Sequence, residues 1–185
     1  MASPSPSPRR LTRIIRVSRA MAWITLLCAL ALGAALLGFP LFDPDGLDLL
    51  IADAFALPAD TVLPPAIRAG LIAIGALPVL VAIAGLLATR ALFLGFARGE
   101  VFTPRSGRWL KRIGLIVLLS APLGVAVGAA ASALASLPAP EGARQVVVAI
   151  SSDQIAMTIA GVLVLVLGWT LEEAARLADE NRQFV

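Results

Sequence analysis

Four long stretches without a charged side chain constrain this chain more than any other feature. They cover about residues 21–42, 69–89, 113–137 and 155–171, and none contains Lys, Arg, Asp or Glu. About 20 consecutive apolar residues cross the hydrocarbon core of a bilayer as a helix, and charged side chains are costly there. We therefore predict an all-α integral membrane protein, built as a bundle of four transmembrane helices.

The composition supports this prediction and limits the chemistry. Hydrophobic residues make up 59% of the 185 residues and charged residues 15%, whereas soluble domains are about a quarter charged. The single cysteine, Cys28, excludes an intrachain disulfide and a multi-cysteine metal site, and there is no His to act as a general base. The chain also lacks the common phosphate-binding, zinc-protease and serine-hydrolase motifs. We expect no catalytic residues, no cofactor and no metal, and a protein that is not an enzyme.

The connections between the stretches differ sharply in charge. If the chain crosses the bilayer four times, 13 of its 15 basic residues fall on one side. Basic loops stay in the cytoplasm, so we expect both termini there, in a bacterial cytoplasmic (inner) membrane. Trp23, Trp109 and Trp169 each lie at the cytoplasmic end of a stretch, where aromatic side chains are typical.

Outside the four stretches, the sequence predicts little regular structure. Residues 1–20 are expected to be a disordered Ser/Pro-rich tail with a basic flank, followed by one membrane domain, residues 21–185. The flank either orients the first span or lies as a helix in the membrane interface. In the extracytoplasmic loops, residues 47–54 and 145–150 predict a short outer helix or strand, and Arg68 is a candidate partner for outer aspartates.

Residues 90–112, the basic hairpin, are the one loop between spans on the cytoplasmic side. Gly99 fits the left-handed position that ends a helix, and Thr103 and Pro104 fit the N-cap and first position of the next helix. Phe102 is placed to pack on that helix. The cationic side chains form a candidate cytoplasmic interaction surface, made of Arg98, Arg105, Arg108, Lys111 and Arg112.

These cations have a simple interpretation, orientation of the spans and contact with lipid headgroups. Docking of a cytoplasmic partner is the second. A basic patch alone is a weak signal for nucleic acid, and we expect no direct nucleic-acid binding. The acidic residues near the C-terminus are expected to form a solvated helix end or to neutralise the hairpin; they are Glu172, Glu173, Asp179 and Glu180.

The third stretch carries small residues at every fourth position, a helix-packing ladder of Ser120, Gly124, Gly128, Ser132 and Ser136. Small residues at this spacing let helix backbones approach closely in lipid. Ala34 with Gly38, and Ala156 with Ala160, offer matching faces within the chain. Homodimerisation through the ladder is the alternative.

Two segments also resemble a known family. FARGEVFTPRSGRWLKRIG, residues 96–114, resembles the cytoplasmic-loop pattern of an uncharacterised bacterial membrane-protein family, domain of unknown function 2975, and LEEAARLADENRQFV, residues 171–185, is similar to its closing segment. The loop residues that carry the resemblance are Gly99, Phe102, Thr103, Arg108, Leu110, Arg112, Ile113 and Gly114. The resemblance implies four spans and no assigned activity. Its members are often encoded beside small helix-turn-helix regulators, which implies such a regulator as a partner.

Together these observations favour a non-enzymatic membrane protein that acts as a membrane partner or sensor for a cytoplasmic regulator. A small channel or permease component, built around the proline-containing second and third stretches, is the alternative.

Overall fold

The computed structural model describes residues 8–42, 64–137 and 146–183, together with the single residues 46, 49, 50 and 53. Its long helices are α1 (Pro8–Phe42), α3 (Pro65–Ala97), α4 (Pro104–Ala135) and α5 (Ser152–Gln183). Each of the four is long and apolar enough to cross a membrane. The predicted all-α fold with four candidate spans is therefore confirmed.

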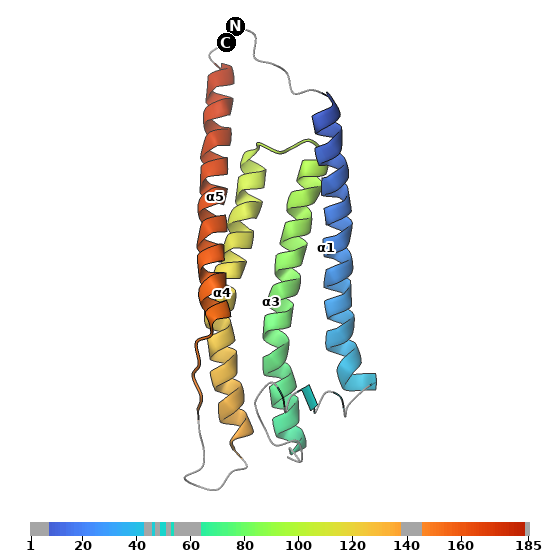
Figure 1. Ribbon diagram of the computed structural model, residues 1–185, viewed down its shortest axis with the longest axis vertical. Helices are drawn as coiled ribbons and strands as arrows, with labels where there is room; N and C mark the ends of the chain where they lie inside the picture. Colours follow the sequence, from blue (N-terminus) through green and yellow to red (C-terminus); the bar gives the residue numbers. More distant parts are fainter. Residues whose placement is uncertain are drawn as a thin grey trace.

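Each helix is longer than a bilayer requires. The shortest have 32 residues, which at about 1.5 Å per residue is roughly 48 Å, against about 30 Å of hydrocarbon. The excess lies mainly at the end that holds Pro8, the α3–α4 turn and Gln183, which we call the basic end (Figure 1). Because α1 starts at Pro8 and runs unbroken to Phe42, the basic flank extends the first span and is not a separate interfacial helix.

The helices stand in an open row rather than in a closed bundle, which corrects the sequence prediction. Between described residues, extensive contacts link α1 with α3, α3 with α4, and α4 with α5. Figure 1 shows the same order, from α5 at one edge to α1 at the other. Apolar outer faces can remain in contact with lipid, since hydrophobicity does not drive helices together inside a bilayer. Closure of the row is therefore not required.

Glycines bring α4 and α5 close together in an antiparallel register. A Cβ added at Gly114 would lie 2.5 Å from the backbone nitrogen of Leu165, and one at Gly161 would lie 2.5 Å from that of Leu118. Gly168 stands against the backbone of Lys111 and Gly107 against that of Glu172 in the same way. Each glycine thus receives a larger residue of the facing helix. We call these four glycines the glycine seam.

The small-residue ladder on α4 lies further from the basic end than this seam, and only some of its residues contact α5 or the segment before it. The Ser120 hydroxyl lies 3.3 Å from the sulfur of Met157 on α5, and Ser132 accepts the Val147 N–H at 3.0 Å. A Cβ at Gly128 would meet nothing within 4 Å. The expected matching faces are wrong: Ala156 and Ala160 are exposed, and the side chain that a Cβ added at Gly38 would meet, at 3.9 Å, is Phe42 of the same helix. The α4–α5 register places the larger Gln154 and Met157 opposite the ladder instead.

The other two interfaces also use small side chains. On α1 the buried residues are Ser18, Ala22, Thr25 and Ala29, spaced three or four apart along one face, and α3 is the helix in extensive contact with α1. Between α3 and α4, Leu71 and Ala131 are almost fully buried at the end away from the basic end. Small residues bring backbones close enough for dispersion to hold the row.

The connections at the end away from the basic end only partly match the predictions. Residues 146–150 form no strand, and no neighbouring strand pairs with them in the described part of the chain; Val147 hydrogen-bonds to Ser132 of α4 instead. The residues of the predicted outer helix 47–54 mostly lie outside the described residues, as do Asp43, Asp45, Asp48 and Asp60. At the start of α5, Ser151 and Gln154 form the reciprocal bonds of a capping box.

Candidate interaction surface

Helix α3 ends in a tight, fully hydrogen-bonded turn. Gly99 has φ +83°, the left-handed conformation that favours glycine. The Gly99 N–H donates to the Phe96 carbonyl at 3.0 Å, and the Glu100 N–H donates to the Gly95 carbonyl at 3.1 Å. This pair of bonds is the Schellman arrangement, which satisfies carbonyls that a helix end leaves free. Arg98, the last residue before the turn, is exposed.

Helix α4 begins at Pro104, five residues after Gly99, and a hydrogen bond connects its first turn to the end of α3. Thr103 is the N-cap, and its side chain accepts the Ser106 N–H at 3.2 Å, with Pro104 in the first turn. The buried Ser106 hydroxyl donates to the carbonyl of Glu100 at 2.7 Å. This bond joins the first turn of α4 to the end of α3. Sequence reasoning missed it, although Ser three residues after a threonine N-cap was visible.

Phe102 does not pack on α4 as expected. Its side chain is 78% exposed at the tip of the turn. The extended conformation of Thr103 (φ −129°, ψ 152°) fixes where the chain enters α4, and Ser106 occupies the buried position at that helix start. An aromatic side chain is thus presented at the tip of a cationic hairpin.

The five cationic residues of the predicted surface separate into two groups. Arg98, Arg105, Arg108 and Arg112 are exposed and form no ion pair with any described residue. Lys111 is half-buried against α5 and pairs with the carboxylate of Glu172. The Arg112 guanidinium lies 5.0 Å from the ring centroid of Trp109, a cation–π distance. The available positive charge is therefore that of the four arginines.

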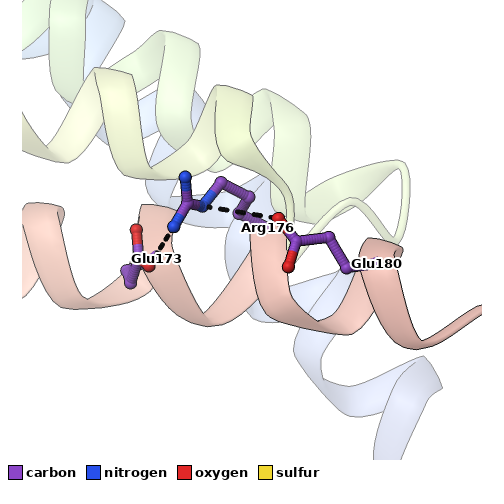
Figure 2. A network of polar contacts seen from close by, with 3 residues as sticks. All are labelled: Glu173, Arg176 and Glu180. Atoms are coloured by element: carbon purple, nitrogen blue, oxygen red, sulfur yellow. Dashed lines mark hydrogen bonds and ion pairs between the residues drawn. The ribbon is translucent and has the colours of Figure 1, made fainter.

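The acidic end of α5 has a similar division. Glu172 is the carboxylate that neutralises the hairpin, through Lys111. Glu173 and Glu180 instead face Arg176 of their own helix, with N–O distances of 2.7 Å and 3.9 Å (Figure 2). Because Gly107 stands beside Glu172, the last turns of α5 project beyond the start of α4 (Figure 1). The end of α5 thus lies beside the hairpin but leaves its four unpaired arginines exposed.

The described residues contain no group of three His, Cys, Asp or Glu side chains that could hold a metal ion. The basic end presents exposed guanidinium groups and one exposed aromatic ring on a short, capped turn.

Four long apolar helices with charged extensions at one end define a multi-pass α-helical membrane protein. The family model described as "Protein of unknown function (DUF2975)" matches residues 21–184, and the chain belongs to this family. The resemblance drawn from the hairpin and the C-terminal segment is therefore confirmed. No match was found among curated proteins or among solved structures.

Proposed function

We propose that this protein is a non-enzymatic partner in the bacterial cytoplasmic membrane for a soluble cytoplasmic regulator, which docks on the basic hairpin. The observation that carries the proposal is the exposure of Phe102 together with four arginines that have no ion pair within the described chain. Aromatic and arginine side chains dominate the binding energy of many protein interfaces. An exposed aromatic ring inside a cationic rim suits a partner with an acidic surface around an apolar pocket.

The turn is also held in one conformation, which favours binding. The Schellman bonds, the Thr103 cap and the Ser106–Glu100 bond fix the backbone on both sides of Phe102. A preorganised surface loses less conformational entropy on binding than a flexible loop does. The neighbouring end of α5 adds carboxylates. A partner that contacts both elements therefore meets positive and negative side chains side by side.

The orientation belongs to the same proposal. The described cations of the hairpin, of the α1 flank and of α5 all lie at the basic end, where α1 begins and α5 ends (Figure 1). Basic segments are retained in the cytoplasm during insertion. We therefore place both termini and the hairpin in the cytoplasm, where a soluble regulator can reach them.

A photo-crosslinking amino acid at position 102 tests the proposal in native membranes. We expect one major soluble protein to be captured there, identified by mass spectrometry as a DNA-binding regulator. The matched control is Leu137, which is 49% exposed and lies at the opposite end of α4; the same crosslinker there should capture none of it.

A second comparison tests the charge. Arg98→Gln with Arg108→Gln should abolish capture at position 102, whereas Arg16→Gln with Arg19→Gln, also exposed at the basic end, should not. Equal capture in all variants would contradict docking on the hairpin. Solute flux into proteoliposomes, with no capture, would support the channel or permease alternative instead.

A further inference from the structure

A second feature of the molecule is an apolar groove on the face of the row between α3 and α4. Its volume is about 510 Å³, and Met157 of α5 closes one side. On α3 it extends from Pro78 to Thr89, which at about 1.5 Å per residue is roughly 17 Å. One leaflet supplies about 15 Å of hydrocarbon, half the thickness of the bilayer core. The length of the groove therefore matches one leaflet, and the groove lies on the half of α3 nearer the basic end.

The wall of the groove offers no free polar group. The Thr89 hydroxyl donates to the Gly85 carbonyl at 2.8 Å, and the Ser120 hydroxyl donates to the Val117 carbonyl at 2.6 Å. The remaining lining is aliphatic, from Pro, Val, Ala, Gly, Leu, Ile and Met side chains. Such a wall suits a hydrocarbon chain and not a hydrated solute.

Cations lie on the same face of α4 as part of this groove, closer to the basic end. On α4, Arg105, Trp109 and Arg112 continue at three- and four-residue spacing into the lining residue Ile116, so all four share one helix face. Arg98 and Arg105 also line a smaller hollow of about 100 Å³ beside Trp109. Glu100 is the one acidic residue in that lining, so its charge leaves an excess of positive charge.

We propose that the groove and these arginines form a binding site for one anionic phospholipid. An acyl chain lies in the groove between Pro78 and Thr89, and the headgroup phosphate is bound by Arg105 and Arg112, with Trp109 at the level of the ester groups. Anionic lipids bind basic pockets between transmembrane helices at the cytoplasmic surface. Arg105 and Arg112 also belong to the proposed docking surface for a regulator, but lipid binding needs no soluble partner, so each proposal can fail without the other.

Native mass spectrometry of the purified full-length chain in detergent tests the charge. The probes are phosphatidylglycerol and phosphatidylcholine with identical acyl chains. We expect one molecule of phosphatidylglycerol to be retained more tightly than phosphatidylcholine. The double substitution Arg105→Gln with Arg112→Gln should lower the affinity for phosphatidylglycerol roughly 30-fold, because each arginine contributes a factor of about five. Arg19→Gln, which is exposed on α1 at the same end, should leave retention unchanged.

The groove itself is tested by filling it. Ala82 lines the groove and is exposed, so Ala82→Phe should reduce retention of both lipids. Ala84 is exposed on the same helix but does not line the groove, so Ala84→Phe should retain lipid like the native chain.

Three results would overturn the proposal. The first is equal retention of the two lipids by the native chain. The second is displacement of the lipid by inorganic phosphate, which would indicate a site for free phosphate. The third is a change of oligomeric state in Ala82→Phe with lipid retention unaltered, which would indicate that a helix of a second copy fills the groove.

Discussion

At the level of single residues, the absence of a side chain sets the distance between α4 and α5. Gly107 and Gly114 are seven residues apart on α4, and Gly161 and Gly168 are seven apart on α5. In the antiparallel register, each accepts backbone and side-chain atoms of the other helix. A methyl group at these positions would require the helices to separate, with a loss of packing along the whole interface.

Gly114→Ala and Gly161→Ala should each lower the free energy of unfolding by about 1–3 kcal/mol, the usual cost of overpacking. Gly128→Ala is the matched control, because a Cβ there meets nothing within 4 Å; it should be neutral or stabilise the helix by up to about 1 kcal/mol. Thermal unfolding of the purified chain in detergent measures all three. Equal melting temperatures would show that the glycine seam is not a close contact.

Sequence reasoning found small-residue packing in α4 but chose other residues. The ladder from Ser120 to Ser136 has a regular four-residue spacing, whereas the seam has its seven-residue spacing in two separate helices. The equal seven-residue spacing of two glycines in each of two helices was the signal in the sequence that could have indicated this contact. Which small residues touch depends on the rotation and register of both helices, and neither can be derived from one helix alone.

At the level of elements, the α3–α4 turn is specified by local chemistry. Gly99, Thr103 and Pro104 have roles that follow from backbone conformation and hydrogen bonding over a few residues, so the sequence predicted the turn closely. The Ser151–Gln154 box at the start of α5 is a similar case. Phe102 differs, because its position depends on the direction in which the chain enters α4.

Gly99→Ala should destabilise the turn by about 1–2 kcal/mol, since a left-handed backbone brings Cβ close to the following carbonyl. Gly99→Asn should cost less, because asparagine tolerates this region. Amide hydrogen exchange at Glu100, whose N–H closes the turn, measures the effect. Unchanged protection in the alanine variant would mean that φ +83° is not required at this position.

At the level of the whole molecule, hydropathy predicts the number of spans and charge predicts their direction, but neither determines which helices are neighbours. Three of the four apolar stretches lie inside described helices, whereas the third, residues 113–137, ends two residues beyond α4, which stops at Ala135. At the basic end all four helices extend further than predicted. The open row could not be predicted, since apolar side chains facing lipid and those facing another helix have the same composition.

Reporter fusions test the orientation. A reporter that is active in the cytoplasm should work after Val185, and alkaline phosphatase, which needs the periplasm, should work when inserted after Leu137. The physical reason is retention of the basic end during insertion. Replacing the six basic residues of the hairpin with Gln should produce molecules of mixed orientation. Phosphatase activity after Val185 in the native chain would contradict the topology.

The row has a further consequence for how the protein is made. Its spatial order, α1, α3, α4, α5, is also the order of synthesis. Each newly translated helix can therefore pack on the helix inserted just before it. Every extensive interface among the described helices joins two helices that are consecutive in this order. Low sequence separation between partners favours rapid assembly, so the nascent chain can complete its structure as it leaves the ribosome.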